Sequence, residues 1–131
     1  MKREVAKREE ESLENFSVRA EQDWKNIEGL IDRLDKEFDA WQIGKDIEKT
    51  RIREVEAEVR ILLGNIEYLE YEIKKNLPKM AENGWIPDTE VERDIASIFS
   101  DIQVLKSSKL PLLKQKYEEL KKKIQVNDFR N

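Results

Sequence analysis

The side chains that could do chemistry in this chain are carboxylates and amines, because the sequence contains no Cys and no His. That absence excludes disulfide scaffolds, thiol catalysis, zinc sites built on Cys or His, and catalytic triads that need an imidazole. Four acids stand out by their spacing: Glu11 and Glu14 are three residues apart, and so are Asp32 and Asp35. Residues three apart share one face of a helix, so each pair could act together.

The two acidic pairs resemble those of the all-helical nucleotide pyrophosphohydrolases of the MazG kind, which bind magnesium through two such pairs. The resemblance implies Mg²⁺-dependent cleavage of nucleoside triphosphates. This chain departs from that pattern in two ways, since Asp32 stands where the pattern has Glu and both pairs fall on one predicted helix. With 29 acids among 131 residues, pairs at this spacing also arise by chance. We therefore interpret these acids as solvated helix surface, keep the hydrolase as a remote alternative, and predict no cofactor or bound metal.

The lysine-rich C-terminal stretch is the second group that could bind a ligand. From residue 106 to residue 131, eight basic residues stand against three acids, a local net charge of +5. Amines in such a stretch could contact the phosphates of a nucleic acid. The candidate contacts are Lys116, Lys121, Lys122 and Lys123. Because basic residues also stabilise the C-terminal end of a helix, nucleic-acid binding is the alternative function and not the leading one.

The composition is typical of a protein made of long helices. Charged residues make up 41% of the chain, against about 25% in an ordinary globular domain, and there are only four Gly and three Pro. No apolar run approaches the roughly 20 residues of a membrane span, so we expect no transmembrane segment and no secretory signal. We predict a cytoplasmic protein. Its richness in Lys and Glu is also typical of heat-adapted proteins.

Two stretches of apolar residues predict the first two helices. In both stretches the apolar positions recur at steps of three and four, which indicates amphipathic helices over about residues 4–42 and 46–76. Between the two stretches, Gly44 and Asp46 are the only turn signals. The alternative is one helix of about 75 residues, which would need a partner chain along its length. We favour the hairpin.

A third helix is predicted over about residues 89–126. Thr89 and Glu92 match the capping box that often begins a helix. Pro111 lies inside the predicted helix, where a proline removes one hydrogen bond and clashes with the preceding turn. We therefore expect a kink or a break near residues 107–111, with the same apolar face continuing beyond it.

Together these patterns predict an all-α fold in a single domain covering residues 1–131. The three helices should form an elongated, antiparallel three-helix bundle with coiled-coil-like packing. Their apolar stripes are wider than a narrow seam requires. The additional apolar residues beside the stripes are Leu30, Leu63, Tyr68, Val104 and Leu112. Such residues could be buried against a neighbouring chain.

The leading functional hypothesis is a non-enzymatic interaction or assembly module that pairs with itself as a homo-oligomer or binds a protein partner. Four aromatic or apolar residues are the candidate partner contacts: Tyr68, Tyr71, Trp85 and Ile86. The two tyrosines flank the apolar stripe of the second helix. Trp85 and Ile86 fall in the loop before the third helix, where they either cap the bundle or present an anchor to a partner.

Overall fold

The computed structural model of the protein describes residues 11–42 and 49–130. This part contains α2 (Leu13–Gln42), α3 (Lys49–Asn76), the short 3₁₀ helix η1 (Pro78–Ala81), α4 (Glu90–Ser107) and α5 (Lys109–Arg130). No strand occurs in these two ranges, and the predicted all-α class is confirmed. Within the same ranges, none of the helices has the length and apolar character needed to cross a bilayer.

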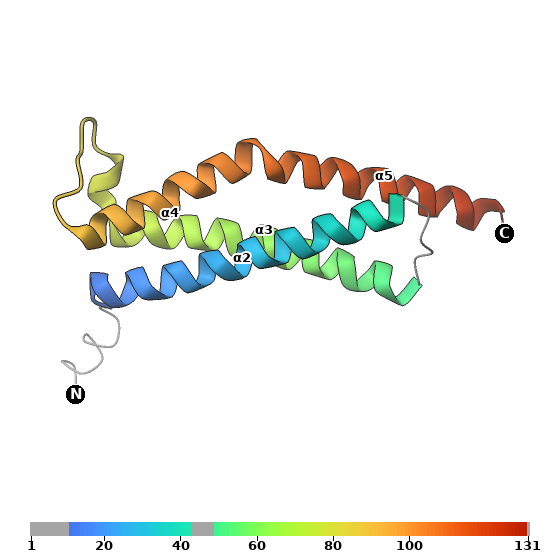
Figure 1. Cartoon of the computed structure of the whole chain (residues 1–131), viewed down its shortest axis with the longest axis horizontal. Helices are drawn as coiled ribbons and strands as arrows, with labels where there is room; N and C mark the ends of the chain where they lie inside the picture. The colour runs from blue at the N-terminus through green and yellow to red at the C-terminus, as the bar shows by residue number, and fades with distance from the viewer. Residues whose placement is uncertain (1–10, 43–48, 131) are drawn as a thin grey trace.

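The helices form an elongated bundle of three rods: α2, α3, and α4 with α5 (Figure 1). α3 runs antiparallel to α2, and α4 and α5 return antiparallel to α3. Because α2 and α3 pack against each other in opposite directions, the predicted hairpin is confirmed and the single long helix is wrong. Gly44 and Asp46, which we expected at the turn, lie outside the described residues, as does the predicted helical segment 46–48.

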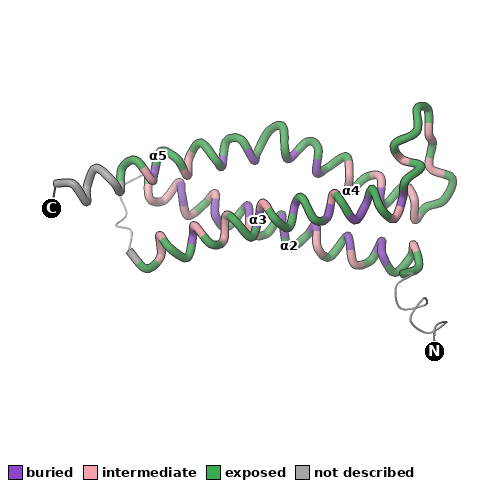
Figure 2. The backbone as a smooth tube through the Cα atoms, turned by 180° about the vertical axis from the view of Figure 1, so that it is seen from behind, coloured by how far each residue is buried: buried purple, intermediate pink, exposed green. Residues whose placement is uncertain are grey.

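Buried apolar side chains from all three rods form one core. Their spacing of three and four residues places them on one face of each helix, and this face points inward along the bundle (Figure 2). The core includes Phe16, Leu34 and Phe38 of α2, Leu62, Ile66 and Ile73 of α3, Ile95 and Ile102 of α4, and Leu113 and Leu120 of α5. The buried leucines of α5 show that the apolar face of the third rod continues past its bend, as predicted.

The first helix begins later than the sequence pattern predicted. The Ser12 hydroxyl accepts a hydrogen bond from the Asn15 amide at 3.1 Å, which satisfies one of the free amides of the first turn. Glu11 and Ser12 therefore precede the helix, and α2 starts at Leu13. The predicted helical residues 4–10 lie outside the described part of the chain.

The connection between α3 and α4 closes one end of the bundle. η1 follows the end of α3, and Gly84 then adopts a φ of +75°, the left-handed conformation that glycine accepts without a steric cost. Trp85 comes next and packs in part against the core, whereas Ile86 is 75% exposed. The tryptophan therefore caps the bundle end, and the isoleucine faces solvent.

The predicted capping box at the start of α4 is confirmed with one difference. Thr89 Oγ1 accepts a hydrogen bond from the Glu92 amide at 3.1 Å. The Glu92 carboxylate reaches back to the Asp88 amide at 3.1 Å, one residue earlier than the usual arrangement. The reciprocal pair still satisfies two free amides and defines the N-terminus of α4.

The third rod bends at Ser108, within the predicted range (Figure 1). Ser108 ends α4 with φ −125° and ψ −81°. The hydroxyls of Ser107 and Ser108 donate hydrogen bonds to the carbonyl of Val104 at 3.1 and 2.6 Å. Pro111 then lies in the first turn of α5, where a missing amide costs little. The break precedes the proline because the first turn of a new helix is the position that accepts it.

Candidate functional site

An apolar ridge runs along the outer face of α3. We define the α3 ridge as five exposed residues spaced four, three, four and three apart: Ala57, Ile61, Gly64, Tyr68 and Tyr71. Ile61, Tyr68 and Tyr71 are 56%, 60% and 58% exposed. The two tyrosine rings stack with their centres 6.5 Å apart. This spacing is that of a coiled-coil seam, and α3 thus carries one seam in the core and a second one on its surface.

Gly64 forms a notch in the middle of the α3 ridge. A β-carbon built at this position would meet no atom within 4 Å. Packing within the chain therefore does not require glycine here, although glycine in an exposed helical turn costs about 1 kcal/mol relative to alanine.

Two arginines tie α3 to α2 beside the core. Arg19 of α2 lies 2.8 Å from Glu72 of α3 and 2.8 Å from Glu11. Arg51 of α3 lies 2.6 Å from Glu37 of α2. The hydrogen bonds that both guanidinium groups donate to these carboxylates raise their pKa above the ordinary value, although partial burial acts in the opposite direction. The charges along this contact are therefore paired within the protein.

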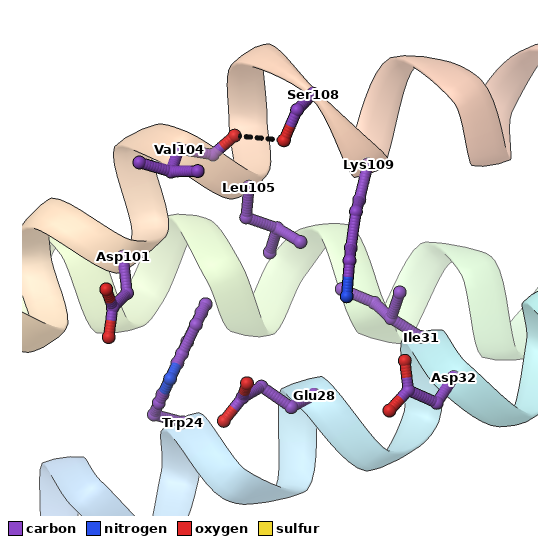
Figure 3. A pocket seen from close by; sticks show the side chains of 9 residues that line it. All are labelled: Trp24, Glu28, Ile31, Asp32, Asp101, Val104, Leu105, Ser108 and Lys109. Atoms are coloured by element: carbon purple, nitrogen blue, oxygen red, sulfur yellow. Dashed lines mark hydrogen bonds between the residues drawn. The ribbon is translucent and has the colours of Figure 1, made fainter.

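A groove opens between α2 and the bend of the third rod (Figure 3). Its volume is about 260 Å³, and we call it the Trp24 groove. Buried apolar side chains form its floor: Trp24, Ile31 and Leu105. Exposed side chains form its rim: Glu28, Asp32, Asp101, Val104, Ser108 and Lys109.

The four predicted partner contacts do not share one environment. Tyr68 and Tyr71 are exposed on the α3 ridge, and Ile86 is exposed in the loop before α4. Trp85 is partly buried against the core. Three of the four side chains are therefore accessible to a partner. Ile61, which the sequence analysis did not select, belongs to the same ridge, and its spacing of seven residues from Tyr68 is the signal that could have identified it.

The apolar residues beside the predicted stripes also divide into two groups. Leu30 and Leu63 are partly buried and complete the core. Val104 and Leu112 are 63% and 60% exposed on the third rod. The additional apolar residues thus complete the core at Leu30 and Leu63, and remain on the surface at Tyr68, Val104 and Leu112.

The predicted phosphate contacts lie in different settings. Lys116 Nζ is 2.8 Å from Asp35 and 2.7 Å from Asp39 of α2. Hydrogen bonds to these carboxylates raise the pKa of Lys116. Lys121 is partly buried, with its amine 5.3 Å from the centre of a tyrosine ring, and residues 122–123 are exposed. Lys116 thus joins α5 to α2 and Lys121 packs over a tyrosine ring, whereas Lys122 and Lys123 are exposed.

In each of the two acidic pairs, one carboxylate forms an ion pair and the other is exposed. Glu11 is held by Arg19, whose hydrogen bonds lower the pKa of that carboxyl despite a small opposing effect of burial. Asp35 is held by a lysine of α5, and Glu14 and Asp32 are exposed. In residues 11–42 and 49–130, no three acidic side chains come close enough together to hold a metal ion.

Comparisons of this chain with protein-family models, with curated proteins and with solved structures give no match. The function of the protein is therefore inferred from the surfaces of the bundle. Two of them combine apolar exposure with a defined shape, namely the α3 ridge and the Trp24 groove.

Proposed function

We propose that the protein is a non-enzymatic interaction module that self-associates through the α3 ridge. The observation that carries this proposal is the second seam on α3, which follows coiled-coil spacing and presents two stacked tyrosines to solvent. Tyrosines are enriched among the residues that dominate binding energy at protein interfaces. The ridge from Ala57 to Tyr71 extends over about four helical turns, a length suited to a second helix lying along it.

An antiparallel pair of ridges related by a two-fold axis brings large side chains against small ones. Tyr68 of each copy then packs over Gly64 of the other copy, and Ile61 packs against Tyr71. In this arrangement the glycine provides the close approach between helices that nothing within one chain requires. The symmetry also closes the assembly at two copies.

Sedimentation equilibrium at micromolar concentrations tests the self-association. We expect the native chain to form a dimer and the double variant Tyr68→Glu/Tyr71→Glu to be a monomer, because the seam would have to bury unpaired carboxylates. Val18→Glu is the matched control, since Val18 is an apolar residue of α2 that is 71% exposed. This control should remain a dimer. A native chain that is monomeric throughout the concentration range contradicts the proposal.

Gly64→Ala separates stability from association at the same position. The substitution should stabilise the single chain by about 1 kcal/mol, because alanine favours the helix. It should also weaken the dimer, because the added methyl group occupies the notch that receives Tyr68. Urea denaturation and sedimentation measure the two effects independently, and a dimer strengthened in parallel with the fold would contradict the close approach at Gly64.

A cytoplasmic location is part of the same proposal. The absence of Cys is compatible with a reducing compartment. Localisation of a tagged full-length chain in a cell fraction tests it.

Nucleic-acid binding is the second candidate function, supported by the lysines at residues 121–123, of which Lys122 and Lys123 are exposed. It predicts retention of DNA or RNA that weakens steeply with salt and is lost when all three lysines become Glu. No retention at low salt would exclude this candidate.

A further inference from the structure

The Trp24 groove has a composition that self-association through the α3 ridge does not explain. Its lining comes from α2, α4 and α5, and no residue of the α3 ridge contributes to it. Apolar groups form the floor, and the carboxylates of Glu28, Asp32 and Asp101 stand on the rim (Figure 3). The groove therefore combines an apolar surface with negative charge.

The rim carboxylates have no partners in the part of the chain that the structure describes. None of the three forms an ion pair within 4.0 Å there or a side-chain hydrogen bond. Lys109 is the cation of the rim, and its side chain extends toward Asp32 without forming an ion pair (Figure 3). Three carboxylates against one ammonium leave the rim with a net charge of −2. A cationic occupant would complement that charge.

Trp24 is the large aromatic group of the groove floor. The side chain is 8% exposed, and its indole N–H has no acceptor among the described residues. No fully buried side-chain nitrogen or oxygen in these residues lacks a partner, so the indole nitrogen must open to the surface. In Figure 3 the indole stands between Asp101 and Glu28 at the groove. The N–H is thus open to water, and the aromatic ring offers apolar contact area on which an apolar group of an occupant can pack.

The bend of the third rod shapes this groove. Val104, Ser108 and Lys109, which lie at or beside the break, line one side of it. At this point α4 and α5 arch away from α2 (Figure 1), whereas Lys116 further along α5 returns to within ion-pair distance of α2. The opening is therefore local to the bend.

We infer that the Trp24 groove binds an amphipathic, cationic helix of a partner protein, which inserts an apolar side chain over Trp24 between flanking Lys or Arg residues. The volume of about 260 Å³ suits one or two side chains, since pockets for drug-sized ligands begin at about 300 Å³. Val104, which lines the groove and is 63% exposed, adds apolar surface to its rim. A helix laid along the groove would complete a four-helix arrangement.

A fluorescence titration tests the inference with a defined probe. The probe is a synthetic amphipathic helix of about 18 residues with a leucine face and a lysine face, and its counterpart carries Glu in place of Lys. Trp41→Phe and Trp85→Phe leave Trp24 as the single tryptophan, whose emission is followed. We expect the lysine peptide to shift the Trp24 emission saturably at one peptide per chain, and the glutamate peptide to leave it unchanged.

Matched charge variants assign the binding to the groove. Glu28→Lys/Asp32→Lys should weaken the binding of the lysine peptide at least tenfold. The control Glu14→Lys/Asp94→Lys changes the net charge equally at exposed positions outside the groove and should bind like the parent. Equal weakening in both pairs would overturn the inference, as would binding of both peptides alike or peptide binding without a change in Trp24 emission. An equal shift produced by butylammonium alone would overturn the helical occupant.

Binding of the lysine peptide to the Trp24 groove should not depend on the α3 ridge. The titration repeated on Tyr68→Glu/Tyr71→Glu should give the same affinity, because the two surfaces share no residue. Peptide binding lost in this variant and retained in Glu28→Lys/Asp32→Lys would place the peptide on the ridge and overturn the groove assignment. Dimerisation, measured by sedimentation, should be unchanged in the groove variants.

Discussion

The charges that border the contact between α2 and α3 differ in their pairing from those around the Trp24 groove, at the bend of the third rod. Toward α3, Arg19 binds Glu72 at 2.8 Å and Arg51 binds Glu37 at 2.6 Å, so the charged groups that border this contact have partners on the opposite helix. Toward the third rod, the rim carboxylates of the Trp24 groove have no partner among the described residues. Paired and unpaired charges thus lie on one helix.

The bend of the third rod accounts for this difference. α3 is continuous from Lys49 to Asn76, and the ion pairs between α2 and α3 lie toward both of its ends. The third rod is interrupted at Ser108 and departs from α2 beside Asp32. One break in a helix therefore leaves carboxylates of α2 without partners on the third rod, and the core beneath them is kept.

The largest loss of stability is expected from truncation of core side chains, and two positions can be compared. Ile66→Ala in the middle of α3 should cost about 3–4 kcal/mol, because a cavity remains in a fully covered region. Leu105→Ala should cost about 2 kcal/mol, because the floor of the groove lies next to solvent and leaves a smaller enclosed void. Ile66 is 1% exposed and Leu105 is 6% exposed. Urea denaturation measures the stability of both variants, and equal losses would contradict the difference in how the two positions are covered.

The next largest effect is expected from the loss of Arg19, which forms ion pairs at the contact between α2 and α3. Arg19→Ala should cost about 2 kcal/mol, because Glu72 is nearly buried and would lose its counter-charge. Lys25→Ala is the control, since Lys25 and Glu21 form an exposed pair within α2, and it should cost less than about 0.5 kcal/mol. Similar losses in the two variants, measured by urea denaturation, would show that the contact between α2 and α3 does not depend on Arg19.

The carboxyl group of Glu70, at the contact between α3 and α4, should make the stability of the protein depend on pH. Burial raises the pKa of Glu70, but hydrogen bonds from Gln103 and Lys106 and the nearby Lys74 together lower it below the ordinary value of 4.5. A carboxyl with a lowered folded-state pKa contributes stability above its unfolded pKa, and this contribution is lost as the pH falls through the folded pKa. Below pH 4.5, the native chain should therefore lose stability more steeply than Glu70→Gln. Urea midpoints measured across this range check it, and parallel profiles would be evidence against the paired state of Glu70.

The smallest effect on stability is expected at the rim of the Trp24 groove. Glu28→Gln with Asp101→Asn should change the free energy of unfolding by less than about 0.5 kcal/mol, because neither carboxylate has an internal partner to lose. A slight gain at low salt is expected, since two like charges near each other are removed. Urea denaturation at two salt concentrations measures it. A loss above about 1 kcal/mol would mean that these carboxylates are paired in solution.

Most of the fold could be predicted because its signals are local. Apolar steps of three and four residues are a property of the helix itself, and they identify the buried faces of all three rods. The capping residues Thr89 and Glu92, the left-handed Gly84 and the break before Pro111 depend on a few neighbouring residues. The start of α2 was missed although Ser12 is a local signal, because the charged residues before it did not interrupt the helical pattern.

The helices, their inward faces and the bend can be read from the amino-acid sequence, since each follows from contacts within one or two turns. Which surfaces remain open depends on how the helices pack against one another. Arg19 and Glu72 are 53 residues apart, and their pairing depends on the register between two helices. The Trp24 groove likewise depends on where the bent rod leaves α2. Spacing along one chain specifies the face of a residue, but only packing specifies what covers that face.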